Sequence, residues 1–141
     1  MSFLSSLPNA SLIDVLKAYP ELAKPIHEFA QILMRGDSPF TEGERELIPA
    51  FVSYFNQCNY CRSSHTAVAE KFGQSKELMK EFPDNLIPNK MKPILNYVKK
   101  LNAAPSQVEK ADVDAILAAG WYEKAVVPTA LVCGFFNLMN R

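Results

Sequence analysis

The chain has 141 residues, of which 48% are hydrophobic, and its 15 basic and 15 acidic side chains cancel to a formal net charge of zero. This composition predicts one packed globular core and excludes a disordered chain. The balanced charge leaves no electrostatic footprint for nucleic acid, and no apolar run approaches the roughly 20 residues of a membrane span. Because the first residues lack the pattern of a signal peptide, we expect a cytoplasmic protein without nucleic-acid or membrane partners.

Helical periodicity dominates the sequence. Ser11 is a candidate cap for the first helix, and Thr41 with Glu44 forms a capping box for the third, which contains Pro49. Ser106 and Glu109 are spaced as a second capping box. The expected helices cover residues 12–19, 23–35 (with Pro25 in the first turn), 42–56, 59–72, 76–82, 90–102, 106–120 and 121–141. No alternating strand pattern of useful length appears, so we predict an all-α bundle of seven to eight helices in a single domain, 1–141.

The last expected helix is apolar on nearly every side, which is typical of a helix buried in a core or in a subunit interface. It supports the expectation of a homo-oligomer. Asn137 and Asn140 interrupt its apolar surface, either because they line a pocket or because they form hydrogen bonds across a subunit boundary. Cys133 lies among apolar neighbours and is interpreted as a core cysteine.

Cys58, Cys61 and His65 are spaced at i, i+3 and i+7, which places them on one face of an α-helix. Gly73 is a stop signal for that helix, so both cysteines lie at its N-terminal end. There the helix dipole and free backbone N–H groups favour a thiolate, the nucleophilic form of cysteine. A second thiol one turn away can then close a disulfide, and the motif predicts thiol redox chemistry.

His65 distinguishes the two thiols. It lies four residues after Cys61, within hydrogen-bonding range on a helix, and can accept the Cys61 proton. Cys61 is then the better-activated thiol, and Cys58 is the resolving thiol or the one that meets an external reductant. The opposite assignment stays open, because redox motifs of this type often use their first cysteine as the exposed nucleophile.

A carboxylate from the preceding helix completes the predicted site. If the helices over 42–56 and 59–72 form an antiparallel hairpin, a glutamate of the first helix can orient His65 and help to move the proton. Spacing alone does not choose between Glu42, Glu44 and Glu46.

Two other interpretations of the motif stay open. The cysteines and His65 can be buried polar residues without chemistry. Alternatively, two thiolates, the imidazole and Glu46 can hold zinc, although one straight helix presents such ligands poorly to a tetrahedral ion. The alternative function is therefore a non-catalytic redox-sensing or zinc-binding helical oligomer.

The segment Glu46-Leu-Ile, twelve residues before Cys58-x-Tyr-Cys-x-x-x-His65, resembles the signature of the carboxymuconolactone decarboxylase/AhpD-like superfamily. The closest branch is that of the AhpD-like alkylhydroperoxidases, or peroxidase-related proteins. The segment from Val113 to Trp121 and the apolar helix after it are similar to the C-terminal part of that branch. The resemblance covers roughly residues 25–141, with the core motif in 41–73, and implies an all-helical fold that assembles into trimers or hexamers.

The resemblance also implies an activity. Redox-active members reduce hydroperoxides with a cysteine pair that cycles between dithiol and disulfide, without a cofactor or metal, and a lipoyl-bearing protein or related dithiol re-reduces them. Carried over by position, Cys61 attacks the peroxide, Cys58 resolves, and His65 and Glu46 form the proton relay. Tyr60 stands where the best-characterised members have a histidine of that relay, and a phenol is a poor base near neutral pH.

Overall fold

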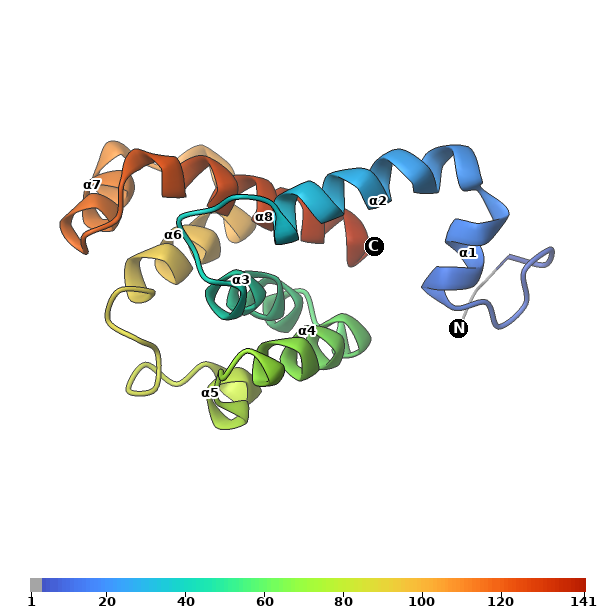
Figure 1. The fold of residues 1–141 in the computed structure, drawn as a ribbon, viewed down its shortest axis with the longest axis horizontal. Helices are drawn as coiled ribbons and strands as arrows, with labels where there is room; N and C mark the ends of the chain where they lie inside the picture. The colour runs from blue at the N-terminus through green and yellow to red at the C-terminus, as the bar shows by residue number, and fades with distance from the viewer. Residues whose placement is uncertain (1–3) are drawn as a thin grey trace.

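The computed structural model describes residues 4–141 of the protein. Within this range the chain forms eight α-helices and two 3₁₀ helices and no strand, which confirms the all-α prediction (Figure 1). In chain order they are α1 (Leu12–Ala18), α2 (Pro20–Arg35), α3 (Glu42–Phe55), α4 (Asn59–Lys71), α5 (Lys76–Glu81), α6 (Lys92–Ala103), η1 (Pro105–Gln107), α7 (Lys110–Ala118), η2 (Glu123–Ala125) and α8 (Val126–Met139).

Helix α3 forms the centre of the core. Its residues from Arg45 to Ser53 are all buried, and it packs against α4, α5, α6, α8 and α2. The predicted capping box begins it, with the Thr41 hydroxyl accepting from the Glu44 backbone N–H and the Glu44 carboxylate accepting from the Thr41 N–H. The helix continues through Pro49 without interruption. Side chains on α3 therefore face helices that are distant in sequence.

A tight turn joins α3 to α4. The Cys58 N–H donates to the carbonyl of Ser53 at 2.9 Å and the Gln57 N–H donates to that of Tyr54 at 3.2 Å, the paired bonds of a Schellman motif. Gln57 holds the left-handed position of this motif, with φ of +56°. The turn ends α3 and makes Cys58 the N-cap of α4, so the two helices form the hairpin on which the predicted contact between a glutamate and His65 depends.

Helices α2 and α7 begin at residues other than those predicted. Helix α2 begins at Pro20 and not at residue 23, because proline suits the first helical position, so Pro25 lies inside the helix. Ser106 does not cap α7: Pro105 begins a 3₁₀ turn that contains it. Glu109 is the cap instead, and its N–H donates to the carboxylate of Asp112 at 2.7 Å.

Helix α8 begins at Val126, five residues later than predicted. Trp121 is held out of it, because its indole N–H donates to the carbonyl of Lys90 at 2.7 Å and the Lys90 ammonium lies over the same ring. Within residues 4–141 no single helix is long and apolar enough to cross a membrane. Lys110–Ala118 and Glu123–Met139 reach that length and composition only as a pair, which is bent by 113°.

Helices α1 and α2 form an arm that extends beyond the rest of the molecule (Figure 1). No residue of α1 is buried, and Met34 is the buried residue of α2. The arm exposes large apolar side chains, among them Ile13, Leu22 and Ile32.

Candidate active site: a disulfide beside a buried ionic cluster

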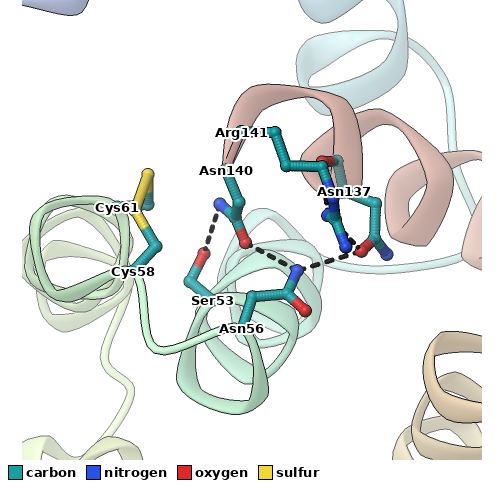
Figure 2. The surroundings of a disulfide bond; sticks show 7 residues. All are labelled: Ser53, Asn56, Cys58, Cys61, Asn137, Asn140 and Arg141. Atoms are coloured by element: carbon teal, nitrogen blue, oxygen red, sulfur yellow. Dashed lines mark hydrogen bonds between the residues drawn. A yellow bond between two sulfur atoms is a disulfide. The ribbon is translucent and has the colours of Figure 1, made fainter. Parts of the chain in front are cut away.

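Cys58 and Cys61 are joined by a disulfide at the start of α4, with their Cα atoms 5.4 Å apart (Figure 2). The predicted position of the pair at the N-terminal end of a helix is confirmed. Cys58 is partly exposed, whereas Cys61 is only 8% exposed. No side-chain hydrogen bond caps α4, so the backbone N–H groups of its first turn are not occupied by a capping side chain.

Glu46 is the carboxylate that meets His65. Its Oε2 lies 2.7 Å from Nδ1 of His65, and its side chain is 2% exposed. The other two candidates are engaged elsewhere: Glu44 closes the capping box with Thr41, and the partly exposed Glu42 lies 3.9 Å from Nε of Arg35. The hairpin therefore selects Glu46 from three carboxylates that spacing could not separate.

Arg35 completes this group, and the sequence analysis missed it. Its Nη2 donates to Oε1 of Glu46 at 2.6 Å, so each oxygen of the buried carboxylate has its own partner. We call Arg35, Glu46 and His65 the ionic cluster. The buried Arg45 holds the end of α2 in place by donating to the carbonyl of Gly36 at 2.7 Å. No sequence signal links Arg35 to Glu46, because a loop separates their helices.

The ionic cluster keeps Glu46 charged. Burial alone would raise the pKa of Glu46, but the hydrogen bonds from His65 and Arg35 outweigh it and hold that pKa below its ordinary value. An ionised Glu46 accepts a hydrogen bond from Nδ1–H of His65, which leaves Nε2 to exchange protons. The imidazole is further fixed by an edge-on contact with Phe136, their ring centroids being 4.4 Å apart.

A cavity of about 160 Å³ opens beside the ionic cluster. It lies between α2, α3 and α4, and all three members of the ionic cluster line it. Its remaining lining residues are Ala30, Gln31, Met34, Ser64 and Val68. Protons that leave His65 or Glu46 therefore have a short path to solvent.

Tyr60 lies outside the ionic cluster. Its side chain is 62% exposed on the first turn of α4, whereas Glu46 and His65 lie toward the interior. The ring contacts of His65 are with Phe136 and its polar contact is with Glu46. The residue between the cysteines is thus a surface residue in this chain.

A second polar cluster lies at the C-terminal end of α3, next to the turn that carries Cys58. Three side-chain amides donate to one another in a closed cycle: Asn56 to Asn137 at 3.0 Å, Asn137 to Asn102 at 2.6 Å, and Asn102 to Asn56 at 3.3 Å. We call these three residues the amide ring. They come from the end of α3, from α6 and from α8, so the ring ties three helices together.

Asn140 extends the amide ring toward the cysteines. Its carbonyl oxygen accepts from Asn56 at 3.0 Å and its amide donates to the hydroxyl of Ser53 at 3.1 Å (Figure 2). Ser53 is the residue whose backbone carbonyl receives the N–H of Cys58. Asn137 and Asn140 are therefore hydrogen-bonded within one chain, where they support the Cys58 turn. Polar residues in an apolar helix were a visible signal, whereas Asn56 and Asn102 gave none.

Cys133 is a buried core cysteine, as predicted. Burial raises its pKa to about 11, against a smaller opposing effect of the hydrogen bond from Asn137. Within residues 4–141, no group of three or more histidine, cysteine, aspartate or glutamate side chains is arranged to hold a metal ion.

The chain belongs to the carboxymuconolactone decarboxylase family, whose model matches residues 20–92. It is similar to the crystal structure of an uncharacterised peroxidase-related protein from Silicibacter sp. TM1040, with 29% identity and a TM-score of 0.82 over 91% of this chain and 71% of that one. A second similar structure is an alkylhydroperoxidase AhpD core, an uncharacterised peroxidase-related protein from Ralstonia eutropha JMP134, with 27% identity and a TM-score of 0.83 over 92% and 70% of the two chains. No curated protein matches the chain. The predicted superfamily and its AhpD-like fold are confirmed.

Proposed function

We propose that this protein is a thiol-dependent hydroperoxide reductase whose Cys58–Cys61 pair cycles between dithiol and disulfide. The observation that carries the proposal is a disulfide at a helix N-terminus on the same helix as His65, which is bound to the buried Glu46. Membership of the family and the likeness to peroxidase-related proteins support the same class of activity.

In the oxidative half of the cycle the Cys61 thiolate attacks one peroxide oxygen. The O–O bond breaks, the alkoxide leaves with a proton from His65 as an alcohol, and Cys61 becomes a sulfenic acid. The sulfur of Cys58 then attacks that of Cys61, and hydroxide leaves with the Cys58 proton as water. The product is a disulfide between the two cysteines, and the peroxide has taken two electrons from the pair.

Glu46 and Arg35 are positioning residues in this scheme. The ionised Glu46 holds His65 by Nδ1 and stabilises the imidazolium that forms when Nε2 takes up a proton. Arg35 satisfies the second oxygen of Glu46, so the buried charge is paired. A dithiol or lipoyl-bearing protein is the proposed reductant that opens the disulfide.

The test is peroxide consumption with an organic hydroperoxide and a dithiol reductant. Cys61→Ser is expected to abolish turnover, and Cys58→Ser to leave a sulfenic acid on Cys61 that a dimedone-type reagent traps. Cys133→Ala is the matched control, because that thiol lies outside the ionic cluster and the disulfide, and it is expected to stay active. Full activity in both of the first two variants, or no loss of free thiols on adding peroxide, contradicts the proposal.

A second candidate function follows from the arm. Helices α1 and α2 expose Ile13, Leu22 and Ile32 to solvent in the single chain, which favours a homo-oligomer, a trimer or hexamer, in which a second copy covers them. The disulfide would then report the redox state of the cytoplasm by changing assembly. Sedimentation with and without reductant separates the two: a change of mass without peroxide turnover favours the sensor, and a sharp monomer mass removes the oligomer.

A further inference from the structure

A groove lies beside the turn that carries Cys58, and neither cysteine is among the residues that line it. Its volume is about 470 Å³, and Gln57 and Asn59, the two chain neighbours of Cys58, line it together with Tyr54, Phe55 and Arg62. Phe55 is 40% exposed, and the exposed Tyr60 follows on the first turn of α4. We call this the Cys58 groove. Aromatic residues and arginine are the residue types that dominate protein–protein contacts.

The Cys58 groove is positively charged. The Arg62 guanidinium lies 5.9 Å from the centre of the Tyr54 ring, and the Lys99 ammonium lies 5.6 Å from that of Phe55. Neither cation forms an ion pair with a carboxylate in the part of the chain that the structure describes. No carboxylate lines the groove, although the chain as a whole has no net charge.

The positive surface continues beyond Arg62. A neighbouring cavity of about 310 Å³ between α4 and α5 is lined by Arg62, Lys76 and Lys80, with Glu70 as its one carboxylate. Cations therefore exceed carboxylates in both hollows that Arg62 borders. A partner approaching this side of the disulfide meets a surface that attracts negative charge.

The burial of the two sulfur-bearing residues decides where a reductant attacks. Cys58 is partly exposed and its chain neighbours form the groove wall, whereas Cys61 is buried. A partner bound in the groove therefore lies next to Cys58, the more exposed of the two cysteines. Thiol–disulfide exchange depends on such access as well as on thiolate character.

We propose that the Cys58 groove docks the reductant, and that this reductant is a protein that carries carboxylates beside its own dithiol. The inference rests on the proposed function. One partner thiol loses its proton and attacks Sγ of Cys58; the disulfide breaks, and Cys61 leaves as a thiolate that takes a proton from His65. The second partner thiol then attacks the mixed disulfide and releases Cys58. The partner dithiol is oxidised to a disulfide, and two electrons and two protons pass to the cysteine pair.

The test measures stoichiometric reduction of the existing disulfide by three probes. Two are synthetic peptides of equal length with the same Cys-x-x-Cys dithiol, one flanked by glutamates and the other by lysines, and the third is neutral dithiothreitol. At low salt the glutamate peptide is expected to react about tenfold faster than the lysine peptide, with both rates normalised to dithiothreitol. High ionic strength is expected to reduce this ratio.

Variants assign the effect to the groove. The double variant Arg62→Gln, Lys99→Gln is expected to bring the ratio of the two peptide rates close to one. Lys124→Gln is the matched control, because Lys124 is exposed in η2, just before the start of α8, whereas the amide ring and the disulfide lie near the other end of that helix. It is expected to keep the wild-type ratio.

Three results overturn the proposal. They are equal peptide rates in the wild type, a ratio that the double variant leaves unchanged, and a double variant that alters the KM of a carboxylate-bearing hydroperoxide while keeping the peptide ratio. The last result assigns the groove to the oxidant. Because the assay needs only the disulfide, it decides the docking question separately from peroxide turnover, whose absence would count against the proposed function instead.

Discussion

Helix α3 carries a polar cluster near each end, and the two are built from different chemistry. The ionic cluster on its first half joins α2, α3 and α4 through a buried carboxylate with two basic partners. The amide ring at its C-terminal end joins α3, α6 and α8 through neutral side chains. Both belong to the hairpin that carries the disulfide: the ionic cluster includes His65 of α4, and the amide ring includes Asn56, two residues before Cys58.

The difference between the clusters separates two tasks. Side chains that gain and lose protons serve a reaction in which a thiol must lose a proton and an alkoxide must receive one. Amides do not titrate between pH 2 and 12, so the amide ring holds the Cys58 turn in the same way at any working pH. The molecule thus combines a cluster suited to proton exchange with one suited to fixed positioning.

The largest expected effect is on the ionic cluster. Glu46→Gln keeps the shape of the side chain but removes the charge that stabilises an imidazolium at His65, so kcat/KM for a hydroperoxide is expected to fall by about 10²- to 10³-fold. Glu42→Gln, on the same helix, removes a charge that lies 3.9 Å from Arg35 and is expected to keep nearly full activity. Wild-type kcat/KM in Glu46→Gln would show that the charge of the ionic cluster does not serve proton exchange, which would remove the difference between the two clusters.

The amide ring is expected to matter for stability. Asn137→Ala removes the donor to the side-chain oxygen of Asn102 and one of the two acceptors of the Asn56 amide, at an expected cost of about 2–3 kcal/mol in the free energy of unfolding. Urea unfolding measures it, and the cost is expected to be equal in mildly acidic and mildly alkaline buffer. Asn96→Ala removes an exposed amide on α6 and is expected to change stability by less than about 0.5 kcal/mol. A cost that varies with pH would show that the ring is coupled to a titrating group.

Cys133, which lies beside the amide ring, is expected to lower the stability of the fold at alkaline pH. Its pKa of about 11 in the folded state lies above its ordinary value of 9.0, so the unfolded chain loses this proton first. The stabilisation is complete below pH 9.0 and is lost as pH rises toward about 11, by at most about 2–3 kcal/mol. Unfolding of the wild type and of Cys133→Ala across this range isolates the effect, because the variant lacks the group. If the free energies of unfolding of the wild type and of Cys133→Ala changed with pH in parallel, this expectation would be contradicted.

The smallest expected effect is at the turn between α3 and α4. Gln57 has φ of +56°, a conformation that costs a residue with a side chain about 1 kcal/mol, so Gln57→Gly is expected to raise the free energy of unfolding by up to about that amount. Thermal unfolding checks the sign. Gln31→Gly, inside α2, is the matched control and is expected to destabilise by about 1 kcal/mol. Destabilisation by Gln57→Gly would mean that the side chain itself holds the turn.

Local rules account for what the sequence predicted well. The capping box of Thr41 and Glu44, the cap at Ser11 and the end of α4 before Gly73 each depend on residues within one helical turn. The same rules failed at Ser106, where Pro105 imposed a 3₁₀ turn, and at Trp121, where a hydrogen bond to a distant carbonyl kept the chain out of the helix.

The residues of the candidate site also divide into those that local spacing predicted and those that only tertiary contacts brought in. Cys58, Cys61 and His65 lie on one helix, so their spacing placed them together before any tertiary contact was known. Spacing alone left Glu46 as one of three candidates, because choosing between them required the register of the hairpin, and only the family resemblance singled it out. Arg35 and the amide ring were missed, since Asn56 and Asn137 are 81 residues apart and Arg35 reaches Glu46 across a loop.

The sequence by itself therefore carried the family motif and determined most helices and the position of a cysteine pair at a helix N-terminus, because short-range spacing and capping within a turn or two govern where helices begin and end. Only the tertiary structure showed that Glu46 contacts His65, which arginine pairs with that carboxylate, and how the Cys58 turn is held. Those choices depend on which helix faces meet, and the free energy of burying polar groups in pairs between distant segments sets them.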